Sequence, residues 1–77
     1  MDIETMYILM EQDFESLAQE HDGIADNERL WALGAPDAET AKMHTENMAM
    51  HCLLAKMYRK MKEDVLAFIE TYDDEEI

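Results

Sequence analysis

The sequence of 77 residues contains only two glycines, one proline and one cysteine. Such a low content of glycine and proline, with few β-branched residues, leaves little turn material for a β-sheet and favours an all-α fold. The single cysteine, Cys52, excludes an intramolecular disulfide. No apolar run approaches the ~18 residues that are needed to cross a membrane, and the first residues are acidic where a signal peptide is basic. We therefore expect a cytoplasmic protein that does not contact a membrane.

Basic residues are also scarce. Six Lys and Arg stand against nineteen Asp and Glu, which gives a formal net charge of −13. Residues 1–28 and 63–77 contain no base at all. A charge of this sign repels nucleic acid and anionic lipid, so any partner that is attracted electrostatically is expected to be basic. Apolar residues nevertheless make up 48% of the chain, which argues against disorder.

Residues 2–22 repeat apolar side chains every three or four positions, which is the period of an amphipathic helix. Gly23 follows the last periodic residue and is expected to end this helix. A short connecting helix is then predicted over 28–33, closed by Gly34. We expect its Trp31 to cover the open end of the hairpin; the alternative is a tryptophan presented as a binding hot spot.

The longest periodic stretch runs from Pro36 to Tyr72 and contains no further proline or glycine. Proline suits the first position of a helix, so the sequence predicts one long second helix. Its apolar stripe is centred on Leu54, and the helix is about 55 Å long at ~1.5 Å per residue, more than so short a chain can cover alone. A second copy or a partner is expected to cover part of the stripe. The predicted oligomer interface consists of Met43, Asn47, Met50, Leu54, Met57 and Met61.

These elements predict an all-α fold: an antiparallel helical hairpin of two long helices with a short connecting helix, forming a helical-bundle dimer. The acidic first helix is expected to lie beside the bases of residues 56–62, which selects the topology. We expect a single domain over residues 1–72. Residues 73–77 are predicted to form an acidic flexible tail, because their four acids oppose the negative pole of the helix.

Two groups of residues were considered as chemical sites. His44, Met48 and His51 share one helix face, and with Cys52 they resemble a set of metal ligands. All four belong to one helix, however, and packing at a helix interface is the simpler interpretation. His51 and Cys52 point about 100° apart, too far for a nucleophile and its base. We therefore expect no enzyme, no catalytic residue, no metal and no cofactor.

Methionine is abundant, with eight residues in the chain, and most of them fall on the apolar stripes. Methionine fills irregular cores, but it also suits binding surfaces that adapt to a partner. Asn47 lies among these methionines. It either pairs with its own copy across a twofold axis or stays partly exposed.

The favoured function is that of a small acidic protein-binding module, an inhibitor or antagonist that occupies a basic site on a host protein. In style it is similar to small acidic proteins of phages and mobile elements, although no motif matches a family. A sharper version is a nucleic-acid mimic with an anti-defence role, aimed at a nucleic-acid-binding protein. The alternative is a self-assembling structural or chaperone-like subunit, and a metal-binding helical protein is a minor alternative. The predicted partner-binding residues are Glu4, Ile8, Leu9, Glu11, Glu15, Glu70 and Asp73.

Overall fold

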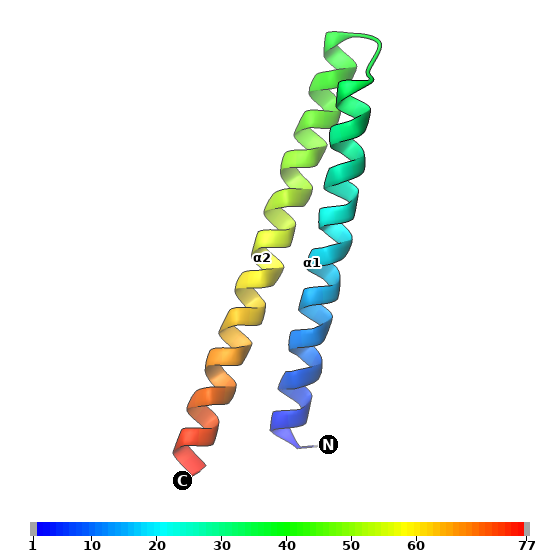
Figure 1. The fold of residues 1–77 in the computed structure, drawn as a ribbon. Helices are drawn as coiled ribbons and strands as arrows, with labels where there is room; N and C mark the ends of the chain where they lie inside the picture. The colour runs from blue at the N-terminus through cyan, green and yellow to red at the C-terminus, as the bar shows by residue number, and fades with distance from the viewer. Residues whose placement is uncertain (1, 77) are drawn as a thin grey trace.

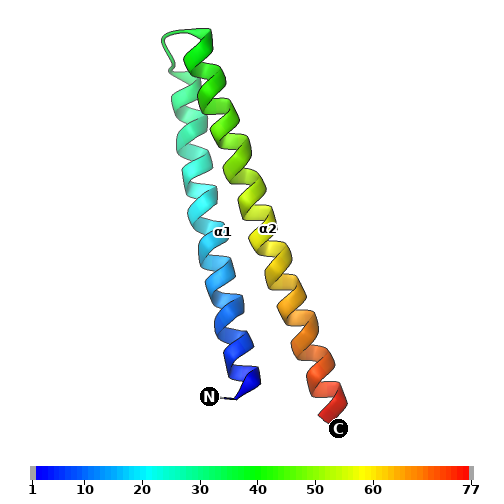
Figure 2. The same cartoon turned by 180° about the vertical axis from the view of Figure 1, so that it is seen from behind.

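The computed structural model describes residues 2–76, with side chains described as far as Thr71. It contains two α-helices, α1 (Ile3–Leu33) and α2 (Ala38–Glu76), and no strand within the described range. The helices lie side by side and antiparallel, so that both termini are at one end and the connection at the other (Figures 1 and 2). The molecule measures 61 × 17 × 11 Å, the shape of a single two-helix layer. The predicted all-α helical hairpin is confirmed.

Both helices begin at a capping aspartate. The backbone N–H of Thr5 donates to Asp2 Oδ1 at 2.7 Å, and the N–H of Thr40 donates to Asp37 Oδ1 at 2.7 Å. Each carboxylate thereby satisfies an N–H that has no partner within the helix. These hydrogen bonds lower the pKa of both aspartates. The second helix thus starts after Asp37, and Pro36 precedes the cap instead of opening the helix.

The prediction that Gly23 ends the first helix is wrong. α1 continues without interruption from Ile3 to Leu33, and residues 28–33 form its last turns instead of a separate connecting helix. A glycine inside a helix costs about 1 kcal/mol relative to alanine. The residues after Gly23 offset this cost, because Ala25 is buried and Glu28 bonds to His44 on α2. The connection is therefore only residues 34–37.

The two helices meet along a regular seam in which the contact positions alternate three and four residues apart. This seven-residue repeat is that of an antiparallel coiled coil. Every seam residue is buried or half-buried. On α1 the seam comprises Tyr7, Glu11, Phe14, Ala18, His21, Ala25, Glu28 and Ala32. On α2 it comprises Ala41, His44, Met48, His51, Ala55, Tyr58, Lys62, Val65 and Ile69.

The register of the seam is fixed by three cross-helix pairs. Phe14 stacks on Tyr58 with ring centroids 6.3 Å apart. One heptad further along α1, His21 meets His51, and one heptad beyond that Glu28 meets His44. Each step of seven residues up α1 is matched by seven residues down α2, so the register does not slip along the seam.

The core of this hairpin is small. The buried apolar residues of the described chain are Ala18, Ala25, Ala55 and Val65, and none of the large side chains described is fully buried. Alanines allow the helices to approach closely, but they remove little apolar surface from water. The stripe centred on Leu54 is therefore not the hairpin core: the seam is displaced by one residue, through Ala55.

Neither helix of the described chain combines the length and the apolarity that a membrane span requires. The backbone of α2 extends to Glu76, and the side chains from Tyr72 onward lie outside the described part. The domain limit at residue 72 and the flexible tail of residues 73–77 stay predictions.

Candidate functional site

The hairpin presents one face that is rich in large apolar side chains. The residues that directly precede seam residues lie on the same side of the two-helix layer in both helices. This is so because the two chains run in opposite directions: seen along one axis, one right-handed helix is followed clockwise and the other anticlockwise. Eleven of these 17 positions are apolar, and the other six are polar or charged. We define the apolar face as these eleven residues together with Ile3 in the first turn of α1: Ile3, Met6, Met10, Leu17, Ile24 and Trp31 of α1 with Met43, Met50, Leu54, Met57, Met61 and Phe68 of α2.

This apolar face is open to solvent in the single chain. Nine of its twelve side chains are at least 36% exposed; Met50 is 51% exposed, and Phe68 is 49% exposed. Monomeric proteins rarely leave a contiguous apolar patch of more than a few hundred Å² uncovered. The six residues predicted as an oligomer interface all belong to this side of α2: five of them are in the apolar face, and Asn47 directly precedes the seam residue Met48.

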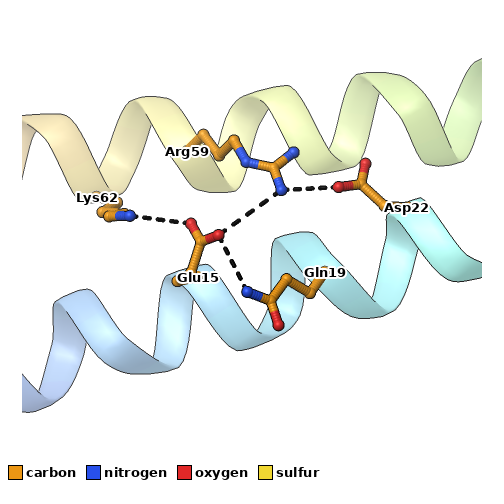
Figure 3. A network of polar contacts seen from close by, with 5 residues as sticks. All are labelled: Glu15, Gln19, Asp22, Arg59 and Lys62. Carbon is orange, nitrogen blue, oxygen red and sulfur yellow. Dashed lines mark hydrogen bonds and ion pairs between the residues drawn. The ribbon is translucent and has the colours of Figure 1, made fainter.

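The opposite side of the layer is polar, because the residues that directly follow seam residues are mostly charged. Figure 3 shows the network at its centre. The Arg59 guanidinium donates to Asp22 Oδ2 at 2.7 Å and lies 3.7 Å from Glu15 Oε1. Lys62 Nζ donates to Glu15 Oε2 at 3.0 Å, and the Gln19 amide donates to the same carboxylate at 3.3 Å. Two residues of α2 thus clamp two carboxylates of α1.

The network perturbs the carboxylates that it contains. The hydrogen bond from Lys62 holds the pKa of Glu15 below its ordinary value, and the hydrogen bond from Arg59 does the same for Asp22. Asp22 in turn raises the pKa of Arg59. Partly exposed ion pairs such as these add little stability one by one, but across two helices they fix the register. Glu15 was predicted to bind a partner because it has no basic neighbour one turn away on its own helix. The other helix supplies two bases, Arg59 and Lys62, so Glu15 is already paired within the hairpin, and its role in binding a partner stays a prediction.

All three histidines of the chain lie in the seam. His21 Nδ1 and His51 Nδ1 are 2.8 Å apart, and His21 also stacks on Tyr58 with ring centroids 5.6 Å apart. His44 Nδ1 bonds to Glu28 Oε2 at 2.5 Å, and Glu28 is only 9% exposed. Each imidazole therefore has a partner on the other helix. Sequence reasoning placed His44 and His51 on one helix face but did not find Glu28 or His21 opposite them.

The geometry of the histidines differs from that of a metal centre. His44 and His51 are engaged with separate partners on α1, while Cys52 is exposed. Among the side chains described, which end at Thr71, no group of three or more His, Cys, Asp and Glu is arranged to hold a metal ion. His44 and His51 serve the contact between the helices, which is the simpler of the two interpretations of the sequence.

The loop end carries a second apolar feature. Trp31 is 56% exposed and lies against His44, with ring centroids 5.7 Å apart. Leu30 and Leu33 are also exposed, so the prediction that this segment covers the open end is wrong: it lies at the closed end of the hairpin. An open hollow of about 360 Å³ is lined by Leu30, Trp31, Gly34, Ala35, Pro36, Thr40 and His44.

The other predicted partner-binding residues are spread around the open end. Glu4 and Glu11 belong to the first turns of α1 and Glu70 to the last part of α2, which is the same end of the molecule (Figure 1). Among the described side chains none of these three forms an ion pair. Ile8 is 39% and Leu9 43% exposed, on the polar side and the outer edge of α1. The side chain of Asp73 lies outside the described part.

No protein-family model matches the chain, and neither the curated proteins nor the solved structures contain a significant match. A function is therefore inferred from the fold and the surfaces of this hairpin.

Proposed function

We propose that the chain is a homodimeric helical protein-binding module that acts as an inhibitor or antagonist by occupying a basic site on another protein. The observation that carries the proposal is the mismatch between core and surface: the buried apolar residues are three alanines and Val65, while nine of the fifteen exposed large apolar side chains of the described chain lie on one outer face. A chain that folds in this way gains most of its apolar burial from association with other polypeptides.

Dimerisation is supported by the small size of the hairpin core. A domain of this length is marginally stable even when its large apolar residues are inside. Here nine large side chains of the apolar face are at least one-third exposed. Each fully buried side chain of this kind contributes about 1.5–3 kcal/mol relative to the exposed state. Covering the face therefore offers a substantial gain in stability.

A basic partner is supported by the charge that remains after the internal ion pairs are formed. Asp22 and Glu15 are held by Arg59 and Lys62, but most of the nineteen acids have no base to meet, since the chain has only six. Such a surface attracts a basic site and repels acidic ones. The partner-binding set proposed from the structure is Glu4, Glu11 and Glu70, with Ile8 and Leu9 as the apolar contribution.

In its sharper version this proposal is nucleic-acid mimicry. Carboxylates spaced along a rigid helix pair imitate the charge of a phosphate backbone, so the target is a nucleic-acid-binding protein of the host cytoplasm. The hairpin itself then has no need of a catalytic group, a metal or a cofactor.

The second candidate is a self-assembling structural or chaperone-like subunit, and the methionine-rich apolar face favours it, because methionine adapts to irregular partners. The two candidate functions differ in which surface contacts other proteins. An antagonist requires the acidic open end, whereas an assembly subunit requires only the apolar face.

The test compares two triple variants that remove the same charge at opposite ends of the hairpin. The open-end variant is Glu4→Gln, Glu11→Gln, Glu70→Gln, and the loop-end control is Asp26→Asn, Glu39→Gln, Glu46→Gln. Each immobilised variant is used to capture proteins from host lysate, and the captured protein is purified and titrated at low and high salt. The proposal expects a basic protein that binds the parent and the control, loses affinity with salt, and is lost by the open-end variant. Equal binding by both variants would leave recognition to the apolar surfaces.

A further inference from the structure

We propose that a second copy of this chain covers the apolar face, related by a twofold axis that runs along the hairpin, so that α1 of each copy lies on α2 of the other and both loops are at the same end. The inference rests on the proposed dimer and specifies its geometry. The result is an antiparallel four-helix bundle with the Arg59 network on its outside.

The dimensions of the apolar face fit a second hairpin better than a single helix. The face has one row of large side chains on each helix, from Ile3 to Trp31 on α1 and from Met43 to Phe68 on α2. It therefore spans both helices and most of the 61 Å length. One added helix would fill the groove between the rows, whereas a two-helix layer of equal length covers both. A stable interface needs about 800 Å² per partner, which a face of this length provides.

The charge at the rim of the face selects the orientation. Asp13 and Glu20 directly precede seam residues of α1 and flank its apolar row, and no base lies on α1 before Arg29. If the loops lay at opposite ends, α1 would face α1 and these carboxylates would meet their own copies. Like charges held in such contact oppose association.

With the loops at the same end, the rim of α1 meets α2 instead. In the register of the seam, Asp13 lies at the height of residue 59 of α2, close to Lys60 on the outer edge of that helix. Lys60 is exposed and bonded to Asp64 of its own helix at 3.1 Å, whereas Lys56 directly follows the seam residue Ala55 and lies on the polar side. Opposite charges at the rim favour this pairing and disfavour the other.

The same axis places identical residues at identical heights. Asn47 directly precedes the seam residue Met48 and is half-buried in the single chain. With the axis along the hairpin, the two Asn47 side chains of the dimer lie at the same height. Each amide can then donate one hydrogen bond to the other and accept one from it. A polar pair of this kind in an otherwise apolar bundle fixes register and copy number.

The experiment measures distances between spin labels on Cys52→Ser protein, with one cysteine introduced per chain. Glu39→Cys places the label at the loop end, and Leu53→Cys places it near the middle on the outer edge. With the loops together, the two copies of each label lie at the same height on diagonally opposite helices. Both labels then give similar, short distances, limited by the width of a bundle whose neighbouring helices are about 8–10 Å apart. With the loops apart, the middle label stays short, whereas the two loop-end labels are about 50 Å apart at a rise of 1.5 Å per residue.

Each outcome decides the proposal. Short distances at both positions support it. A short middle distance with a long loop-end distance overturns the orientation. The absence of any dipolar coupling, with a mass of 9.0 kDa by light scattering at tens of micromolar, overturns the second copy as the occupant. That last result would not affect the proposal that the acidic open end binds a basic partner, since the lysate capture tests that proposal independently.

Discussion

The imidazoles of His21 on α1 and His51 on α2 stack across the seam with their Nδ1 atoms 2.8 Å apart. One nitrogen must carry the proton and the other must accept it, so the two rings adopt complementary tautomers. This contact lies between alanine layers, with Ala18 and Ala25 on either side of His21 along α1. It is a directional contact next to the small buried alanines of the seam.

A double-mutant cycle tests the coupling of this pair. His21→Leu leaves the half-buried His51 without its partner and is expected to reduce the free energy of unfolding by about 1–3 kcal/mol. His51→Leu should cost a similar amount. The double variant replaces both polar groups by apolar ones and should cost less than the sum of the two. Additive effects in urea denaturation would show that the two imidazoles are independent.

Gly23→Ala is expected to stabilise the protein. Gly23 lies inside α1, its φ is not positive, and an added Cβ would meet nothing within 4 Å. Alanine should therefore raise the free energy of unfolding by about 0.5–1 kcal/mol. Had the residue ended the helix in a left-handed conformation, as its position in the sequence indicates, the same change would destabilise. The sign of the change in melting temperature distinguishes the two.

The sequence was sufficient for the architecture of this protein. Two apolar periodicities and the scarcity of glycine and proline gave two long antiparallel helices, and segregated charge matched the observed pairing of α1 with Arg59 and Lys62. The extent of α1 could not be predicted in this way, because local propensity at Gly23 is weaker than the contacts that Ala25 and Glu28 make with the other helix.

The position of the seam was missed for a different reason. Ranking residues by hydrophobicity selects Met50 and Leu54, whereas the contact between the helices uses His51 and Ala55, one residue away. A signal was present, since Ala18, Ala25 and Ala32 recur every seven residues. The methionines were predicted either to fill the core or to form an oligomer interface, and that interface stays a prediction.

Ala55→Leu tests whether the two helices pack closely at the seam. Ala55 is 1% exposed, so a larger side chain must push the helices apart. Overpacking of this kind typically costs about 1–3 kcal/mol. Ala49→Leu is the matched control, because Ala49 is exposed on the same helix. We expect the control to change the urea midpoint little. Equal effects of the two substitutions on the urea midpoint would contradict the placement of Ala55 in the seam.

The ion pair of Asp22 with Arg59 predicts a pH dependence. The pKa of Asp22 is lowered in the folded state, so the unfolded chain binds a proton more readily. The pair therefore stabilises the fold above the unfolded pKa of about 3.9, and this contribution is lost as the pH falls through the folded pKa. Asp22→Asn should melt at a lower temperature than the parent at pH 7. The difference should shrink as the pH falls below the unfolded pKa and through the lower folded pKa; a difference that stayed constant over this acid range would exclude the ion pair as its cause.

Self-association is tested by two lysine substitutions on α2 that are matched in charge and in exposure. Met50 is 51% exposed on the apolar face, and Leu53 is 59% exposed on the outer edge of the same helix. Either lysine reduces the net negative charge by one, so a general relief of repulsion would strengthen both dimers equally.

We expect the two substitutions to differ because only Met50 is proposed to be desolvated between copies. Met50→Lys should weaken the dimer at least about tenfold, which corresponds to 1.4 kcal/mol, whereas Leu53→Lys should leave its dissociation constant within a factor of about two. Analytical ultracentrifugation gives both constants, and circular dichroism at high protein concentration shows whether each variant keeps its helices. If Leu53→Lys dissociated the dimer while Met50→Lys did not, the interface would lie on the outer edge of α2, and the apolar face would be left to another protein.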